Sequence, residues 1–275
     1  MGVTVDGDDV EQAVREVAAA EVVSRFGRLR ADQIHEKSPG DLVTDADRAS
    51  ELALTSRLRA IADLPVVGEE ATAADPSLLG LVAEAPAVWV VDPVDGTSNF
   101  VAGSPDHAVI VVLVEAGVTT RCWLYQPAHD TMLRAELGCG ARRDGATVRA
   151  DDPGGGPPAP GVLKTGYLPS EVRDRLVGLT EGGSGSVDLL TGAGSGRGCC
   201  PFDYEDAVNG AVGFLIYWRT LPWDHAGPAL YASEAGLRVG RPGGSAYEPG
   251  DHGSGLIVSH AAVWDEVDAA FGRAL

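Results

Sequence analysis

The chain has 275 residues, and its charge limits what it can bind. It carries 21 Lys and Arg against 40 Asp and Glu, which gives a formal net charge of −19. Nucleic-acid binding depends on clustered cationic charge, so this composition argues against a nucleic-acid partner. Hydrophobic residues make up 44% of the chain, enough for the core of one large domain or of two closely packed halves.

Signals for secretion, membrane insertion and disulfide bonding are weak in this sequence. Residues 1–11 are acidic and lack the basic and apolar regions of a signal peptide. No run approaches the ~18 apolar residues that span a bilayer. Four cysteines without a CxxC pair provide neither a disulfide framework nor a structural zinc site. We therefore expect a reduced, cytoplasmic enzyme without a membrane partner.

Hydrophobic periodicity predicts helices and strands that alternate along the chain. The expected elements are a helix over 9–30, a helix over 45–61, a short strand at 66–67, strands over 88–91, 107–115 and 118–126, a hairpin turn at 144–145, a helix over 204–209, a strand over 213–218, a helix over 223–235, a strand over 255–259 and a helix over 261–271. This order is typical of an α/β or α+β protein in layers.

Two segments rich in Gly, Pro and Ser interrupt this pattern. The segment 151–161, DDPGGGPPAPG, is predicted to be a linker between an N-terminal half, 1–150, and a C-terminal half, 151–275. The segment 182–198 is predicted to be a loop around a short apolar piece at 187–190. The sequence therefore predicts two halves that pack together.

The segment from Trp89 to Phe100, WVVDPVDGTSNF, holds the strongest chemical signal. A buried strand ends in Asp92 and Asp95, and paired buried carboxylates are costly unless a cation compensates them. The residues that follow, DGTS, are expected to open a helix whose free N–H groups attract an anion. A cation on one side and helix amides on the other would hold a phosphate between them. A plain helix N-cap with an Asx turn is the alternative.

Further acids extend this pattern. Glu69 and Glu70 follow the short strand at 66–67, and Asp224 stands at the start of a predicted helix. These acids offer hard oxygen ligands, and no Cys or His stands at metal-binding spacing, which favours Mg²⁺ over zinc. Asp224 alone would be an ordinary helix cap, so only its convergence with the other acids would make it a ligand.

Four segments together resemble the inositol monophosphatase family of Mg²⁺-dependent, lithium-sensitive phosphatases. They are DLVTDAD at 41–47 with Lys37 before it, GEE at 68–70, WVVDPVDGTSNF at 89–100 and PWDHAGPALYASEAG at 222–236. The resemblance runs from about residue 9 to 271, in the family's order and approximate spacing. It implies the layered αβαβα sandwich of the inositol monophosphatase and fructose-bisphosphatase type, commonly a homodimer.

The resemblance implies a metal centre of two Mg²⁺ ions. Glu69, Asp92 and the carbonyl of Val94 would hold the first ion. Asp92, Asp95 and Asp224 would hold the second, and a weaker third ion at Glu69 is left open. Because the emptied site would be strongly negative, metal is expected to bind before or together with the substrate.

The resemblance also implies phosphate-binding and catalytic residues. Gly96 and Thr97 would donate backbone N–H groups to the phosphate, with Ser98 beside them. Thr97, hydrogen-bonded to Asp47, would position and deprotonate a metal-activated water, and Glu70 would support that network. The water would attack phosphorus in line while a metal stabilises the leaving alkoxide.

The substrate end departs from the family pattern. Inositol-specific members have a glutamate seven residues before the WD aspartate, where this chain has Tyr217. The family's small GSA or GTA segment corresponds to Gly198, Cys199 and Cys200. Tyr217, Trp218 and Arg219 would form an aromatic and partly cationic wall, with Tyr167 as a weaker candidate. Because Tyr217 and Trp218 alternate along a strand, one of them is expected to belong to the core.

The leading hypothesis is a Mg²⁺-dependent phosphomonoesterase that acts on a small polyol, sugar or nucleoside phosphate. A 3′-phosphonucleotide or fructose-bisphosphate phosphatase of the same family is the first alternative. The second is a catalytically idle family member that regulates a partner protein. The complete set of acids together with Thr97 argues against the idle alternative.

Overall fold

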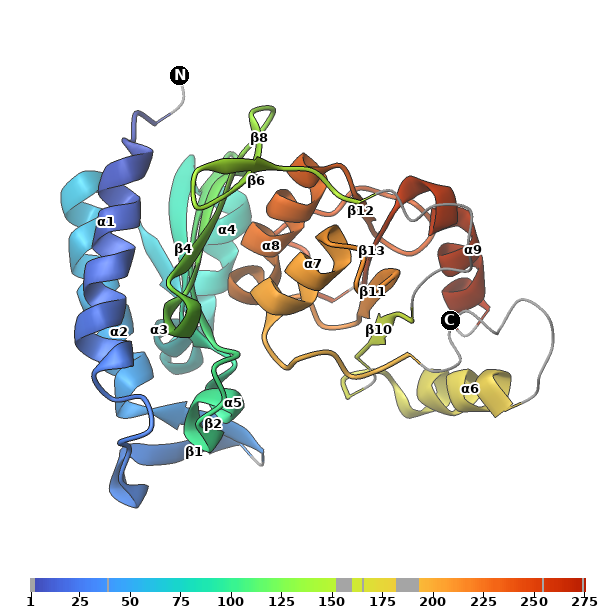
Figure 1. Ribbon diagram of the computed structural model, residues 1–275, viewed down its shortest axis with the longest axis horizontal. Helices are drawn as coiled ribbons and strands as arrows, with labels where there is room; N and C mark the ends of the chain where they lie inside the picture. The colour runs from blue at the N-terminus through green and yellow to red at the C-terminus, as the bar shows by residue number, and fades with distance from the viewer. Residues whose placement is uncertain are drawn as a thin grey trace.

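The chain folds into five alternating layers of helices and sheets, as Figure 1 shows. This computed structural model describes residues 3–38, 40–151, 160–164, 166–181, 193–253, 255–273 and 275, and the side chains of 176–181 are not among the described parts. The order of the layers is helices, a large sheet, helices, a small sheet and helices. The expected layered α+β sandwich is therefore confirmed.

Two sheets form the framework. The large sheet has the order β3 (Val66–Gly68), β4 (Ala87–Asp95), β5 (Ala108–Glu115), β6 (Val118–Gln126), β7 (Thr131–Glu136), β8 (Gly140–Arg143) and β9 (Ala146–Val148). The small sheet has the order β10 (Val162–Leu163), β11 (Phe214–Tyr217), β13 (Leu256–Ser259) and β12 (Arg238–Gly240). A separate hairpin consists of β1 (Ile34–Ser38) and β2 (Asp41–Thr44). Residues before 150 thus build the large sheet and residues after 160 the small one.

Helices fill the remaining three layers. The first layer contains α1 (Gly7–Val17), its π-helical continuation η1 (Ala18–Val23) and α2 (Asp45–Ile61); the central layer contains α4 (Leu81–Glu84), α7 (Cys200–Val208) and α8 (Pro222–Ala235); the last contains α6 (Ser170–Glu181) and α9 (Ala261–Gly272). Short turns complete the chain: η2 (Ala31–Gln33), α3 (Glu69–Ala74), η3 (Pro76–Gly80), α5 (Thr97–Ala102) and η4 (Pro127–His129). None of the described helices combines the length and apolarity that a bilayer crossing needs.

Strand β4 shows why the large sheet is buried on both faces. Successive side chains of a strand point to opposite faces, so an uninterrupted apolar run feeds two cores. Val88 and Val90 pack toward α8, whereas Trp89 and Val91 pack toward α1 and α2. The two sheets are thus held apart by the central helices and share one core with them.

Helix α8 is fixed at both ends, which matters because Asp224 lies in its first turn. Near the start, Gly227 lets the helix approach the large sheet closely: a Cβ there would lie 2.9 Å from side-chain carbons of Val112 and Leu124. Near the end, the Glu234 carboxylate accepts hydrogen bonds of 2.8 Å from two N–H groups of the turn between β7 and β8. The helix therefore has one fixed position on the sheet.

The elements with clear periodicity agree with their predictions. Helix α2 spans 45–61 as expected, and strands β5, β6 and β13 lie within one residue of the expected bounds. The Asp144-Gly145 turn has φ values of 48° and 79°, the two positive values that a two-residue hairpin requires. The first helix is shorter than predicted, because regular helical structure stops at Val23.

Other elements carry weaker signals. Helix α7 begins at Cys200, four residues before its predicted start, and its N-cap Cys199 makes no side-chain capping bond. Helix α6, the hairpin β1–β2 and strand β12 were not predicted. The predicted linker at 151–161 falls mostly outside the described residues, as does the apolar piece at 187–190.

Candidate active site

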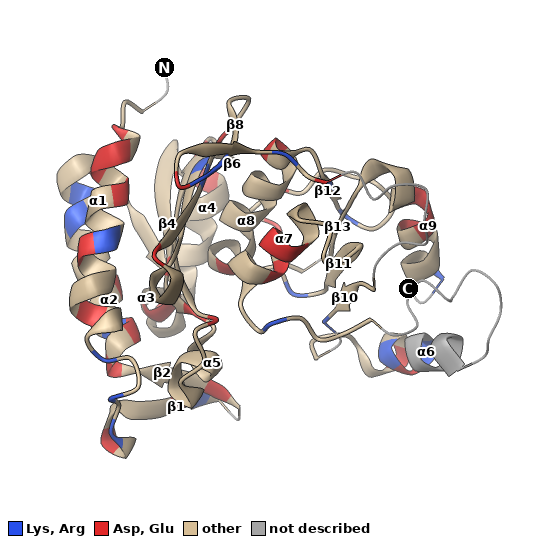
Figure 2. Cartoon of the chain, viewed as in Figure 1, with Lys and Arg blue, Asp and Glu red and all other residues tan. Residues whose placement is uncertain are grey.

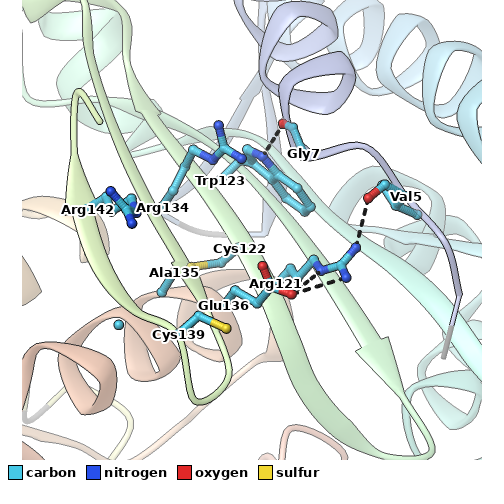
Figure 3. Close-up of a pocket in the computed structure, with 11 residues that line it drawn as sticks. Val5, Gly7, Arg121, Cys122, Trp123, Arg134, Ala135, Glu136, Cys139 and Arg142 are labelled. Carbon is cyan, nitrogen blue, oxygen red and sulfur yellow. Dashed lines mark hydrogen bonds and ion pairs between the residues drawn. The ribbon is translucent and has the colours of Figure 1, made fainter. Parts of the chain in front are cut away.

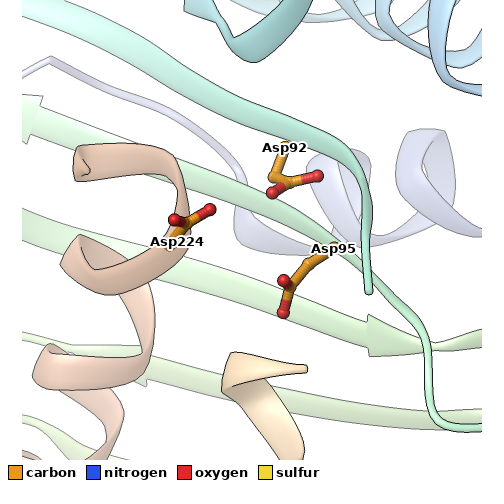
Figure 4. Close-up of side chains that lie close together, drawn as sticks. All are labelled: Asp92, Asp95 and Asp224. Carbon is orange, nitrogen blue, oxygen red and sulfur yellow. The ribbon is translucent and has the colours of Figure 1, made fainter. Parts of the chain in front are cut away.

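Three carboxylates from two distant segments meet between the sheets. Asp92 and Asp95 come from the end of β4, and Asp224 comes from the first turn of α8 (Figure 4). One carboxylate oxygen of each lies within 4.8 Å of the other two. This spacing lies inside the roughly 6 Å that ligands of one bridging metal centre require. The chain therefore brings together acids that are 129 to 132 residues apart.

The end of β4 is shaped to present these acids. The pairing of β4 with β5 shifts register between Asp92 and Asp95, and the Val94 N–H donates to the Asp92 carboxylate at 3.0 Å. Gly96 follows with a φ of 83°, and a Cβ there would lie 2.9 Å from the Asp106 carbonyl oxygen. Only glycine fits this left-handed position, and it turns the chain from β4 into α5.

The electrostatics of the three acids call for a cation. Burial raises the pKa of Asp92 and of Asp224, and repulsion from neighbouring carboxylates raises both further. Burial also raises the pKa of Asp95, to about 6. Within the described ranges, no Lys or Arg forms an ion pair with any of the three. An all-oxygen donor set of this kind fits a hard divalent ion such as Mg²⁺.

Glu69 and Glu70 lie beside the three acids but are joined to a lysine. Lys37, from β1, donates 2.7 Å hydrogen bonds to Oε1 of both glutamates. Glu69 lines the same cavity as the three aspartates but stands outside their close group. Burial raises the Glu69 pKa to about 7, although Lys37 opposes the shift. Glu69 is thus near enough to share the charge of the site without touching its centre.

Thr97 and Asp47 form a hydrogen-bonded pair at the start of α5. The Thr97 hydroxyl lies 3.1 Å from Oδ1 of Asp47 and 3.0 Å from the Val94 carbonyl oxygen. Asp47 is fully buried, and its other oxygen accepts hydrogen bonds from the N–H and hydroxyl of Thr44. A hydroxyl has one proton to donate, so Thr97 can serve only one of its two acceptors at a time. Asp47 is held firmly enough to orient it.

A polar cavity of about 360 Å³ opens over these groups. Its floor contains the three aspartates with Gly96, Thr97 and Ser98, and the β1–β2 hairpin borders it. The first N–H groups of any helix lack partners inside the helix. The cavity therefore places acids and backbone donors of α5 around one space.

A second cavity of about 230 Å³ adjoins the first and is lined by the expected pocket residues Gly198, Cys199, Cys200, Tyr217 and Arg219. Tyr217 is 3% exposed, and its hydroxyl donates to Oδ2 of Asp203 at 2.9 Å. Both Tyr217 and Trp218 contact core clusters, on opposite faces of β11. The Cys200 N–H donates to Asp95 at 2.5 Å, and both cysteines are free thiols.

The pocket also contains groups that the sequence analysis did not single out. Asp203, from α7, accepts hydrogen bonds from Tyr217 and from the Arg197 N–H at 2.5 Å. Lys164 follows β10 and lines the same cavity. His225 is buried, which lowers its pKa to about 3, and its Nδ1 lies 3.1 Å from the Tyr204 hydroxyl. No local motif marks these residues, because their roles depend on packing between α7, α8 and the small sheet.

A separate cavity of about 240 Å³ lies where the N-terminal segment crosses β6–β8 (Figure 3). Its main polar groups have partners within the fold. The Trp123 indole N–H donates to the Gly7 carbonyl, and Arg121 bonds to the Val5 carbonyl and to Glu136. We interpret this cavity as part of the packing of α1 on the sheet.

The layered fold and the acidic cavity between its sheets define a phosphatase-type architecture. The model of the inositol monophosphatase family matches residues 7–270, and the chain belongs to this family. Inositol monophosphatase 2 of Solanum lycopersicum is 30% identical over 87% of this chain and 89% of its own length. The fructose-1,6-bisphosphatase/inositol-1-monophosphatase of Thermotoga maritima is 27% identical over 86% of each chain.

Other relatives have different names. The Nus factor SuhB of Pseudomonas aeruginosa is 29% identical over 80% of this chain and 79% of its own length. Among solved structures, a Thermotoga maritima IMPase superposes with a TM-score of 0.77 over 97% of this chain and 96% of its own, at 23% identity. The family is thus established, and its members include proteins named for phosphatase activity and proteins named as Nus factors.

Proposed function

We propose that this chain is a Mg²⁺-dependent phosphomonoesterase that hydrolyses a small polyol, sugar or nucleoside monophosphate. The observation that supports this most is the close group of Asp92, Asp95 and Asp224 beside the Thr97–Asp47 pair. The group lacks a cationic partner in the described part of the chain, and the pair offers a hydroxyl that can act on water. Two Mg²⁺ ions, with a third left open, belong to the proposal.

Five residues would hold the ions: Glu69, Asp92, Asp95, Asp224 and the carbonyl of Val94. Bound Mg²⁺ would neutralise the acids, lower the pKa of water and stabilise the charge of the leaving oxygen. The carboxylates themselves fix where that charge is placed, because β4 and α8 hold them rigidly. Val94 accepts from Thr97 in the present arrangement, so its carbonyl oxygen would be shared between that hydroxyl and an ion.

The chain's own groups would then bind the phosphate and prepare the water. The backbone N–H groups of Gly96 and Thr97, with Ser98 beside them, would hold the phosphoryl oxygens. Thr97 would orient the water, and Asp47 would accept the proton that Thr97 passes on. Glu70 would support this network through Lys37. Hydrolysis forms a bond between the water oxygen and phosphorus and breaks the ester P–O bond, which releases inorganic phosphate and the free alcohol.

The decisive experiment is phosphate release from a panel of phosphomonoesters, with and without Mg²⁺. We expect Mg²⁺-dependent release from at least one polyol, sugar or nucleoside phosphate, and inhibition by lithium. A 3′-phosphonucleotide and a fructose bisphosphate belong in the panel, because they represent the alternative activities within the family. A chain that releases no phosphate from any of them would contradict the proposal.

The idle regulatory member is the second candidate, and the similarity to proteins named Nus factor SuhB favours it. A net charge of −19 opposes direct contact with RNA, so such a role would act through a protein partner. The same panel separates the two, because an idle member would bind Mg²⁺ without turnover. A cytoplasmic homodimer of two-half subunits, divided near residue 150, completes the proposal, and sedimentation would test the dimer.

A further inference from the structure

The cavity beside the metal-binding acids is unusual in the polar groups that it offers. Three acids line it, namely Asp95, Asp203 and Asp224. Asp95 and Asp224 belong to the proposed metal centre. Asp203 is 1% exposed, and hydrogen bonds from Tyr217 and the Arg197 N–H occupy both of its oxygens. Outside the metal centre, the described wall therefore has no carboxylate left to accept a hydrogen bond from a ligand.

The donors of the wall, in contrast, have capacity left. Arg219 stacks on the ring of Tyr167, with its guanidinium carbon 3.7 Å from the ring centroid, and its Nη2 donates to the Tyr167 hydroxyl at 2.8 Å. A guanidinium has five N–H groups, so most remain for a ligand. Among the residues that the structure describes, no acid lies within ion-pair distance of Arg219. The stack holds the cation in place without neutralising it.

Lys164 supplies a second cation to the same cavity. Its Nζ lies 3.8 Å from Oδ2 of Asp203, which is an ion pair but is longer than a hydrogen bond. The three protons of the ammonium group are therefore not used by Asp203. Lys164 and Arg219 both line the cavity, and Arg219 with Tyr167 also borders the space above the three acids.

We propose that the substrate carries a second anionic group, a carboxylate or a phosphate, on its alcohol part, and that Arg219 and Lys164 bind this group. Sugar hydroxyls both donate and accept hydrogen bonds, whereas carboxylates and phosphates only accept, so a wall of donors selects the anion. The remainder of this acidic chain would repel such a molecule. The inference rests on the proposed function, since it concerns the alcohol that phosphate hydrolysis releases.

The other explanation is that Arg219 only balances the acids of the metal centre. Arg219 does favour the charged form of Asp224. A purely balancing role predicts equal treatment of neutral and anionic substrates, because the ions would supply that balance when bound. A binding role predicts selection between them. The two explanations therefore differ in a measurable ratio.

The test compares three six-carbon substrates that differ at one end: a hexitol monophosphate, the corresponding aldonate phosphate with a terminal carboxylate, and the hexitol bisphosphate. We expect kcat/KM to be about ten-fold or more higher for at least one anionic substrate, as one charge-assisted hydrogen bond would give. The carboxylate and bisphosphate arms show which anion is preferred. The difference should lie mainly in KM.

The variants Arg219→Gln and Lys164→Gln should each lower the ratio of anionic to neutral kcat/KM by about ten-fold. Arg219→Lys should restore part of the ratio, because it keeps the charge but loses the planar donors. Arg142→Gln is the matched control: it removes one exposed positive charge from β8, outside both cavities of the site, and should leave the ratio unchanged.

Calorimetry with the dephosphorylated products separates this inference from the proposed function. With Mg²⁺ present, the aldonate or hexitol phosphate should bind to the native chain more tightly than the hexitol, and Arg219→Gln should remove that preference. Turnover of all three substrates with equal kcat/KM, and no change in Arg219→Gln, would overturn the inference and leave the phosphatase proposal intact. If no substrate is turned over, the phosphatase proposal fails, and the product titrations alone decide whether the cavity binds anions.

Discussion

Two buried acidic groups lie close together in this protein, and they are stabilised in opposite ways. Asp203 receives protein donors: the Tyr217 hydroxyl at 2.9 Å, the Arg197 N–H at 2.5 Å and Lys164 at 3.8 Å. Asp92, Asp95 and Asp224 instead face one another within 4.8 Å. A buried acid with donors supports the fold, whereas buried acids without cationic partners raise the energy of the chain until an ion arrives. The comparison distinguishes a structural acid from a metal-binding one without reference to any motif.

The wider charge pattern makes this distinction necessary. Asp and Glu are spread over α1, α2, α7 and α9 (Figure 2), so acidity alone does not mark the site. On these outer surfaces water solvates the carboxylates, and their number has little meaning for function. Only the local supply of donors separates the three aspartates from the other acids.

The largest expected effect follows from removing charge at the metal-binding acids. Asp92→Asn and Asp224→Asn should each lower kcat about a hundred-fold or more at saturating Mg²⁺, because each amide holds an ion less well. Phosphate release under steady-state conditions measures this. Asp265→Asn, at a 99% exposed position of α9, is the control and should retain full turnover. Near-normal rates in both site variants would contradict the assignment.

A smaller loss of activity is expected at Thr97. Thr97→Ala removes the hydroxyl that bonds Asp47, and it should lower kcat by roughly ten- to a hundred-fold with little change in KM. Thr97→Ser keeps the hydroxyl and should keep most of the rate. Equal rates for the Ala and Ser variants would mean that the Thr97–Asp47 pair only caps α5.

Thermal unfolding with and without Mg²⁺ tests the comparison directly. Mg²⁺ at roughly a hundred times its Kd should stabilise the native chain by about 2.7 kcal/mol. Asp224→Asn should lose that increment without destabilising the chelator-treated protein, because it removes repulsion between carboxylates. Asp203→Asn should behave oppositely, unfolding at lower temperature in both conditions while keeping the Mg²⁺ increment. The same response from both variants would remove the distinction between the two groups of acids.

The smallest expected effect concerns the hydroxyl that satisfies Asp203. Tyr217→Phe should lower the free energy of unfolding by about 1 to 3 kcal/mol, since it leaves a buried acceptor short of one donor. Chemical denaturation measures this change. If instead Tyr217→Phe changes KM strongly while stability stays constant, Tyr217 contacts substrate and the structural role is wrong.

Much of the metal end was readable from the sequence, and most of the substrate wall was not. Asp92 and Asp95 follow a buried strand and precede Gly96, so their chemistry is local and their pattern is visible. The position of Asp224 follows from the resemblance, but its approach to β4 depends on Gly227 and on the packing of α8. The fold class was predictable for a similar reason, because long apolar runs identify their own strands.

The wall residues depend on contacts between segments that are far apart. The partners of Asp203 come from β11, from the residue after β10 and from the stretch before α7, and no local spacing announces that meeting. The role of Tyr217 was ambiguous for this reason: strand alternation placed it either in the core or in the pocket. The structure shows a ring in the core cluster and a hydroxyl bonded to Asp203.

The grip of Glu234 on the β7–β8 turn gives α8 the properties of a lever with a fixed far end. That turn lies at the opposite end of the helix from Asp224, yet it shares the helix's only rigid axis. Lengthening the turn, or removing the carboxylate that holds it, would let the first turn of α8 shift relative to β4. A surface loop remote from the chemistry thereby sets the tolerance with which the acids meet.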